Sequence, residues 1–195
     1  MPRRKIEIQP GSYYHIYNRG VNKNAIFFEP ENYRFFLRRM KSYLKPDEAE
    51  VIAYCLMPNH FHFIMCPLAG NFSDAFGQLC NSYAKALNRR YDRVGPLFQG
   101  RFQAKWIDKN EYLLHLSRYL HLNPVLGKLV QQAEEWEFSS YCDYIGLKRD
   151  EFLKPGIVLE QFSMSEGDLK NQHNSYQAFV KEYRVGDYYS IKHLL

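Results

Sequence analysis

The 195-residue chain is long enough for one domain with an appendage, and its content of 46% hydrophobic and 16% aromatic residues excludes global disorder. Its apolar runs are shorter than the roughly 20 residues of a membrane span, and no apolar segment follows the basic N-terminus, so we expect a cytoplasmic protein without a membrane segment. The net charge of +5 is unevenly distributed. Residues 1–130 carry 19 Lys/Arg and 10 Asp/Glu, whereas residues 131–187 carry 6 Lys/Arg and 11 Asp/Glu. This distribution favours a polyanionic partner for residues 1–130.

The first third of the chain alternates between strand and helix patterns. Residues 12–19 (SYYHIYNR) are rich in strand-forming residues, and the turn sequence GVNKN follows them. A helix is predicted from Pro30 to about Leu44, because apolar residues recur there at three- and four-residue spacing. Two apolar strands over residues 50–57 and 60–66 are separated only by Pro58-Asn59, which predicts an antiparallel hairpin.

The same alternation continues to the C-terminus. Ser73 is the predicted N-cap of a helix that runs to about Tyr91, and residues 101–107 alternate like a strand. Asp108 and Glu111 resemble a capping box that opens a helix, and Asn123-Pro124 is predicted to end that helix at about residue 122. Further helices are predicted over residues 136–146 and 165–184.

This order of elements predicts an α+β fold of ferredoxin-like type. An antiparallel sheet of four or five strands would have helices packed on one face. We expect residues 1–145 to form this domain and residues 146–195 to form a mostly helical C-terminal extension that packs on the domain or flanks it.

Two histidines stand one residue apart in the apolar segment YCLMPNHFHFIMCP. On a strand, His60 and His62 share one face while Phe61 and Phe63 take the other. An unsatisfied buried imidazole is costly, so this face should be wet, hydrogen-bonded or metal-bound. Imidazole is a common ligand of divalent metals, although the same pattern also fits two partly exposed histidines on the open face of a sheet.

The helix that follows residue 108 carries a polar stripe formed by Tyr112, His115 and Tyr119. A tyrosine presented to a metal-holding sheet is a candidate nucleophile, and a divalent ion would polarise a phosphate for its attack. His115 is a further candidate ligand or base. The alternative is that Tyr119 is an ordinary tyrosine of an amphipathic helix.

Residues 85–105 combine basic and aromatic side chains. Basic groups match phosphates and aromatic rings stack on unpaired bases, so the segment fits a nucleic-acid surface, although a solvated helix face followed by a core strand fits equally. The candidate DNA contacts are Lys85, Arg89, Arg90, Arg93, Arg101 and Lys105.

Three segments together resemble a known family. His-Phe-His within YCLMPNHFHFIM matches the HUH motif, and SYAKALNRRYDRVGPLFQGRF and YLLHLSRYLHLNPV follow it in the expected order. Over about residues 12–145 the chain resembles the bacterial single-tyrosine HUH transposases, including their REP-associated branch.

This resemblance implies an enzyme that cuts and rejoins single-stranded DNA next to hairpins. A divalent metal, Mg or Mn, would be held by His60 and His62, with Asn123 as third ligand, and Tyr119 would form a 5′-phosphotyrosyl link to the DNA. Residues 1–145 would then be the catalytic domain. Family members are often homodimers, so a homodimer is expected as one arrangement and a monomer as the other.

Three other functions remain open from the sequence. One is a related protein that processes hairpin repeats of the host rather than moving its own element. Another is a DNA- or RNA-binding regulator with an inactive site, against which the intact His-Phe-His motif and Tyr119 argue. The third is a hydrolytic metallonuclease, which would not need Tyr119.

Overall fold

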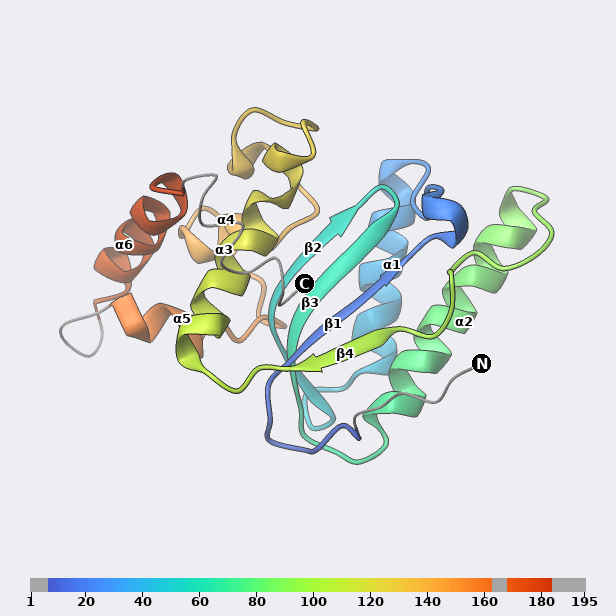
Figure 1. The fold of residues 1–195 in the computed structure, drawn as a ribbon, viewed down its shortest axis with the longest axis horizontal. Helices are drawn as coiled ribbons and strands as arrows, with labels where there is room; N and C mark the ends of the chain where they lie inside the picture. Colours follow the sequence, from blue (N-terminus) through green and yellow to red (C-terminus); the bar gives the residue numbers. More distant parts are fainter. Residues whose placement is uncertain (1–6, 163–167, 184–195) are drawn as a thin grey trace. The chain divides into compact units, whose positions relative to one another are not determined.

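The computed structural model describes residues 7–162 and 168–183, and the chain divides into two compact units (Figure 1). The first unit contains the described part of residues 1–50 together with residues 56–106. The second contains residues 51–55 and the described part of residues 107–195. No helix within the described ranges has the length and apolar composition needed to cross a membrane.

A four-stranded sheet forms the centre of the first unit. Its strand order is β2-β3-β1-β4, and β1 pairs antiparallel with both β3 and β4. The elements are β1 (Tyr14–Arg19), the short η1 (Val21–Lys23), α1 (Pro30–Tyr43), β2 (Ala49–Met57), β3 (His60–Pro67), α2 (Phe72–Arg90) and β4 (Gln103–Trp106).

Helices α1 and α2 lie together on one face of this sheet (Figure 1). The ring of Phe36 in α1 lies 5.3 Å from that of Phe61, and the ring of Phe76 in α2 lies 6.1 Å from that of Phe63. All four rings are buried, so an aromatic layer joins the helices to the sheet. The predicted α+β fold, with four antiparallel strands and helices on one face, is confirmed.

The second unit is mainly helical. It contains α3 (Asn110–Leu126), η2 (Ala133–Glu135), α4 (Tyr141–Tyr144), α5 (Gly156–Leu159), η3 (Glu160–Phe162) and α6 (Leu169–Lys181). Residues 51–55, the middle of β2, belong to this unit through backbone bridges that pair Cys55 with Ser139 and Val51 with Leu153. The predicted division into residues 1–145 and 146–195 stays a prediction.

Three local predictions about helix ends are wrong. Helix α2 begins at Phe72 with Asn71 as N-cap, so Ser73 lies inside the helix. Helix α3 has Lys109 rather than Asp108 as N-cap, and no side chain caps it there. In both cases the path of the chain into the helix decides which residue takes the capping position, and sequence alone does not give that path.

Pro124 also does not end α3, which continues to Leu126. Proline removes one backbone donor and crowds the preceding turn. The carbonyls at the end of the helix are nevertheless satisfied from beyond it, because Gly127 donates to Asn123 at 2.8 Å, Lys128 to Val125 at 2.9 Å and Leu129 to Pro124 at 2.9 Å. These three bonds allow the last turn to form around the proline, so Asn123 follows the helical register.

Candidate metal and nucleophile site

The two histidines of β3 lie side by side on the sheet face opposite α1 and α2. Their ring centroids are 4.9 Å apart, and both side chains are half-buried, whereas Phe61 and Phe63 are fully buried on the other face. The strand register aligns His60 with Arg19 and His62 with Tyr17 of β1. The predicted alternation of faces is therefore confirmed.

A neighbouring amide orients the ring of His60. Its Nδ1 lies 2.6 Å from Oδ1 of Asn59, and Nδ2 of Asn59 donates to the carbonyl of Lys23 at 3.1 Å. The second bond fixes which end of the amide faces the ring, so Nδ1 of His60 donates its proton to Asn59. A metal would then bind this ring through Nε2, with Asn59 acting as the hydrogen-bonded support that metal-ligating histidines usually have.

A third histidine, His15, supports His62. Nε2 of His15 lies 2.8 Å from Nδ1 of His62, the two rings stack at a centroid distance of 5.0 Å, and Tyr17 stacks on the ring of His15 at 4.7 Å. His15 is completely buried, and within the described part of the chain Nδ1 of its ring has no hydrogen-bond partner. When Nδ1 of His62 donates its proton to Nε2 of His15, Nε2 of His62 is the nitrogen that a metal would bind.

Burial keeps these imidazoles neutral. It lowers the pKa of His15 from 6.5 to about 3, and the charge of Lys105 adds to the effect. The pKa of His62 is also lowered well below its usual value, first by burial and then by repulsion from His15 and His60. Neutral imidazole is the form that binds metal, so the first unit holds His62 ready as a ligand.

Asn59 and His15 were not singled out from the sequence. A signal for His15 exists, because the alternation in SYYHIYNR puts His15, Tyr17 and Arg19 on one face of a strand. Which residues of the neighbouring strand lie beside His15 depends on the antiparallel register of β1 and β3. That register brings His15 next to His62, which is 47 positions away in the sequence. Asn59 was predicted only as part of the turn.

The predicted DNA-contacting residues all lie in the first unit. Lys85, Arg89, Arg90 and Arg101 are exposed. Arg90 forms a 2.6 Å ion pair with Glu29, and the guanidinium of Arg93 lies 5.4 Å from the ring centre of Phe28. Lys105 of β4 is aligned with His15 of β1, and burial lowers the pKa of Lys105. The exposed residues are thus the better candidates for phosphate contacts.

Tyr119 and Asn123 lie in the second unit, one helical turn apart on α3. Tyr119 is half-buried, whereas Asn123 is only 7% exposed and its side-chain nitrogen has no hydrogen-bond partner among the residues that the structure describes. Leaving a buried amide without a hydrogen bond costs free energy, so the side chain of Asn123 is suited to bind a ligand. Its oxygen and nitrogen are interchangeable by rotation of the amide, and the oxygen is the atom that a divalent cation would bind.

Buried hydrogen bonds hold α3 in place on both sides of Tyr119. His121 is completely buried, with Nδ1 2.7 Å from the hydroxyl of Tyr176 and Nε2 2.8 Å from Oγ of Ser140. The hydroxyl of Tyr176 donates to Oγ of Ser117 at 3.0 Å. Because that proton goes to Ser117, Nδ1 of His121 donates to Tyr176. The hydroxyl of Ser140 lies 2.8 Å from Nε2 of His121 and 3.2 Å from the carbonyl of Tyr54.

Arg118 makes a second connection between α3 and α6. Its guanidinium lies 4.3 Å from the ring centre of Phe179 and donates to the carbonyl of Phe179 at 3.3 Å. It also donates to Nδ1 of His115 at 2.9 Å. The candidate role of His115 as a ligand or base stays a prediction, and this bond leaves Nε2 as the nitrogen it would use.

The donor set is compatible with a divalent metal at the histidine pair. Within the described ranges, no cluster of three or more His, Cys, Asp or Glu side chains could hold a metal ion by itself. A metal bound by His60 and His62 therefore needs further ligands of other kinds, such as an amide oxygen, water or a phosphate oxygen. Asn123 as third ligand stays a prediction.

Three matches to known proteins bear on the family and the fold of this chain. A family model described as "Transposase IS200 like" matches residues 9–123. A putative REP-associated tyrosine transposase of Haemophilus influenzae is 26% identical in an alignment 105 residues long, and the match covers 47% of this chain and 58% of that protein. The chain thus spans little more than half the length of this relative.

The third match concerns the fold. A solved structure described as a REP-associated tyrosine transposase bound to a REP hairpin has a TM-score of 0.62 at 16% identity, and the match covers 79% of this chain and 98% of that one. The resemblance seen in the sequence is confirmed. Since the family model covers more than half of its residues, the chain belongs to the IS200-like transposases.

Proposed function

We propose that this protein is a DNA transposase that cleaves and rejoins single-stranded DNA next to hairpins. Tyr119 is the nucleophile, His60 and His62 hold a divalent metal ion, and Asn123 is the third protein ligand. The observation that supports this most is the pair of oriented imidazoles, because each has its Nδ1 within hydrogen-bond distance of a neighbouring side chain, as metal-ligating histidines usually have. A protein that only binds DNA needs no such pair.

The chemistry is a transesterification in two steps. The hydroxyl of Tyr119 loses its proton and attacks the phosphorus, the bond from phosphorus to the 3′ oxygen breaks, and that oxygen leaves as a 3′-hydroxyl. The 5′ side of the DNA stays attached to Tyr119. A 3′-hydroxyl then attacks the phosphotyrosine, restores a phosphodiester and returns the proton to Tyr119. No bond energy is lost, so the reaction needs no ATP.

Each residue has a separate task in this reaction. The metal, when bound, supplies positive charge that polarises the phosphate and stabilises the charge developing on its oxygens. His60 and His62 fix its position, with Asn59 and His15 holding their rings. Ser117, Arg118 and His121 hold the helix that carries Tyr119, through their bonds to Tyr176, Phe179 and Ser140.

The DNA substrate is proposed from the relatives. The solved structure that shares this fold is described as bound to a REP hairpin, and the Haemophilus protein is described as REP-associated. A single-stranded palindrome that folds into a hairpin with unpaired flanks is therefore the first substrate to test. Whether the hairpins belong to the protein's own element or to repeats of the host would be decided by which sequences it cuts.

A covalent-trapping assay tests the proposal. Purified protein is incubated with manganese and a pool of end-labelled hairpin DNAs, then run on a denaturing gel. We expect a slowly migrating protein–DNA band that requires the metal and disappears in Tyr119→Phe and in His60→Ala/His62→Ala. Tyr112→Phe is the matched control, since it removes a hydroxyl from the same stripe of the same helix.

The other outcomes identify the competing functions. Cleavage without a covalent band that persists in Tyr119→Phe would mean a hydrolytic nuclease and would reject Tyr119 as nucleophile. Binding of the hairpins with neither cleavage nor a band would indicate a DNA-binding regulator. Loss of the band in Tyr112→Phe as well would show that α3 does not tolerate the loss of a hydroxyl, so the Tyr119→Phe result would then have to be supported by mapping the linked peptide.

A further inference from the structure

The sheet face that carries the histidine pair also carries an arginine beside it. The register of β1 and β3 aligns Arg19 with His60, and strand alternation puts Arg19 on the same face as His15 and Tyr17. Side chains at directly opposite positions of an antiparallel pair start about 4.5–5.5 Å apart. A group bound at His60 therefore lies within the length of the Arg19 side chain.

Gln99 holds the guanidinium of Arg19. Nε of Arg19 donates to Oε1 of Gln99, and the backbone N–H of Gln99 donates to the carbonyl of Arg19 at 2.9 Å. A backbone bridge between the neighbouring residues Gly20 and Phe98 fixes this part of the chain further. One residue thus holds the arginine both at its backbone and at its side chain.

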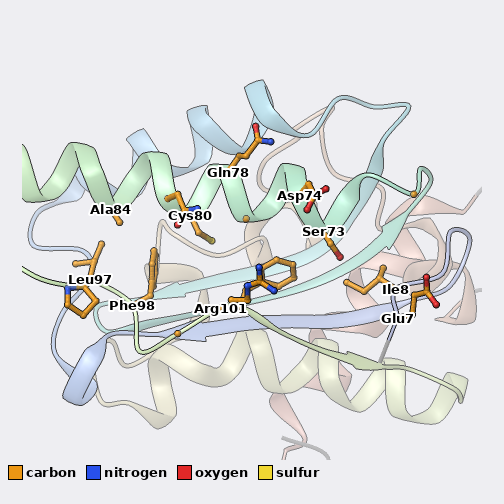
Figure 2. A pocket seen from close by; sticks show the side chains of 16 residues that line it. Glu7, Ile8, Ser73, Asp74, Gln78, Cys80, Ala84, Leu97, Phe98 and Arg101 are labelled. Carbon is orange, nitrogen blue, oxygen red and sulfur yellow. The ribbon is translucent and has the colours of Figure 1, made fainter. Parts of the chain in front are cut away.

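The side chain of Gln99 lies apart from the groove on the helical side of the first unit. That groove lies between α2 and residues 96–102, and every residue of this segment except Gln99 lines it (Figure 2). Arg101, for example, lies between the helix and the sheet in Figure 2. The segment therefore directs Arg101 toward α2, whereas the amide of Gln99 contacts Arg19 on the face of the histidines.

The charge of Arg19 is not neutralised by its partner. Arg38, another exposed arginine of the first unit, forms an ion pair with Glu31 at 2.5 Å. Gln99 is neutral, and within the described ranges the guanidinium of Arg19 makes no ion pair and no further hydrogen bond. Its terminal nitrogens, Nη1 and Nη2, thus keep their N–H donors for a ligand.

A guanidinium at this position suits a phosphate. A phosphodiester carries its negative charge on its non-bridging oxygens, and charge is spread over such oxygens during phosphoryl transfer. The planar fork of an arginine can bond both oxygens, or bond one while a metal ion binds the other. Lys105 also lies on this face, but β1 separates its strand from that of the histidine pair. Arg19 is therefore the better placed of the two cations.

We propose that Arg19 binds a non-bridging oxygen of the phosphate that is held at the histidine pair, and that Gln99 positions its guanidinium. The inference rests on the proposed function, because it names a further residue of the same site. Arg19 stays protonated and stabilises charge by hydrogen bonding, so it adds no proton transfer to the reaction. The sequence did not single out Arg19, since its alignment with His60 depends on the pairing of distant segments.

Probes with one neutral linkage test the contact. Each probe is a labelled hairpin DNA in which a methylphosphonate replaces one phosphate of the unpaired flanks, and the parent hairpin is the tightest binder of a pool. Binding is measured in EDTA so that the probes are not cut. Replacement at one linkage should weaken binding by the wild type about tenfold, because a charged hydrogen bond is lost. Arg19→Gln should bind this probe and the unmodified hairpin equally well.

Two further variants separate this contact from a general loss of charge or of folding. Gln99→Glu keeps the shape of the side chain but pairs Arg19 with a carboxylate, so it should lose the sensitivity to that linkage as Arg19→Gln does. Arg38→Gln removes an exposed arginine of α1, on the other face of the sheet, and should keep the wild-type sensitivity. Thermal melting should show all three variants folded, since each changes an exposed side chain.

Manganese shows whether this linkage is the one at the histidine pair. Tyr119→Phe cannot form the covalent link of the proposed reaction, so its binding can be measured with Mn²⁺ present. Mn²⁺ should strengthen its binding of the unmodified hairpin, and the neutral linkage that removes this gain should be the one that depends on Arg19. The inference is overturned if the two linkages differ, if Mn²⁺ gives no gain, or if the wild type and Arg19→Gln respond alike to every probe.

The outcomes separate this inference from the proposed function. A linkage that depends on both Arg19 and Mn²⁺, without a covalent band in the trapping assay, would support the phosphate contact and reject the transesterification. A covalent band together with no linkage that depends on Arg19 would do the reverse.

Discussion

At the scale of single residues, each ring of the histidine pair has a hydrogen-bond partner that is not itself a proposed metal ligand. His15 and Asn59 each hold Nδ1 of one ring, at 2.8 Å and 2.6 Å. Such supporting hydrogen bonds fix the orientation and the tautomer of a ligand and raise its basicity. The affinity for metal should therefore respond to residues that ligand-motif searches do not include.

Replacing His15 tests this dependence. His15→Leu should weaken Mn²⁺ binding by about 10- to 100-fold, because the ring of His62 loses the group that orients it. His15→Gln retains a hydrogen-bonding amide and should recover part of the affinity. Isothermal titration with Mn²⁺ gives the binding constants, and thermal melting shows whether both variants fold. Equal affinity in His15→Leu and wild type would mean that His62 needs no support from β1.

The residue pattern singled out the proposed ligands His60 and His62 but not the residues that support them, and the reason is geometric. His60 and His62 share a face by the two-residue period of a strand, which the sequence shows directly. His15 contacts His62 only through the pairing of β1 with β3, and Asn59 is oriented by a carbonyl from residue 23. Contacts between distant segments follow from the fold, so periodicity within one segment cannot reveal them.

At the scale of elements, α6 stabilises α3 through a buried polar network. The hydroxyl of Tyr176 lies between His121 and Ser117, and all three side chains are completely buried. The helical prediction for this region was confirmed as α6, Leu169–Lys181, within the described residues. That α6 packs against α3 could not be predicted, because the network joins residues far apart in the sequence. Tyr176 is 55 positions from His121 and 59 positions from Ser117.

Removing the hydroxyl of Tyr176 should show how much this network contributes to the free energy of unfolding. Tyr176→Phe leaves Nδ1 of His121 without its acceptor and Ser117 without its donor, so the free energy of unfolding should fall by about 1–3 kcal/mol. Urea denaturation measures the change. Tyr43→Phe is the control, because Tyr43 is a half-buried tyrosine of α1 and should change stability by less than about 0.5 kcal/mol. Similar values for both variants would show that the network contributes little.

Helix boundaries show the limit of local rules at this scale. The core faces of α1 and α2 follow the three- and four-residue spacing, and Phe36, Met40, Phe76 and Tyr83 are buried as that spacing predicts. The end of α3 does not follow the rule for proline, since bonds from residues 127–129 compensate for it. Local signals thus locate the elements, while the segments packed around them decide where each one ends.

At the scale of the whole molecule, uneven charge should govern the affinity for DNA. Residues 1–130 carry 19 of the 26 basic side chains and 10 of the 21 acidic ones. Each phosphate that a basic side chain neutralises releases counterions, so the logarithm of the binding constant should fall linearly with the logarithm of the salt concentration.

The salt dependence of DNA binding can be compared between two variants, each of which lacks one exposed arginine, one in the basic part of the chain and one in the acidic part. Arg89→Gln, at the end of α2, should reduce the steepness of the salt dependence by about one unit, because one phosphate contact is lost. Arg149→Gln removes an exposed arginine from the acidic C-terminal part and should leave the slope unchanged. Fluorescence anisotropy with a labelled hairpin at several salt concentrations gives both slopes. An equal effect of the two substitutions would contradict the assignment of DNA binding to the basic part.

Buried histidine should also make the folded protein sensitive to acid. Burial lowers the pKa of His121 from 6.5 to about 3, so the unfolded chain binds a proton at pH values where the folded chain does not. The resulting stabilisation is complete above pH 6.5 and is lost as the pH falls toward 3, by about 1 kcal/mol per pH unit for this residue. His121→Gln removes the titrating group, so the variant should be less stable at pH 7.5 but should lose less stability between pH 6.5 and 5. Urea denaturation across this range measures both slopes, and parallel slopes for variant and wild type would show that other groups cause the acid sensitivity.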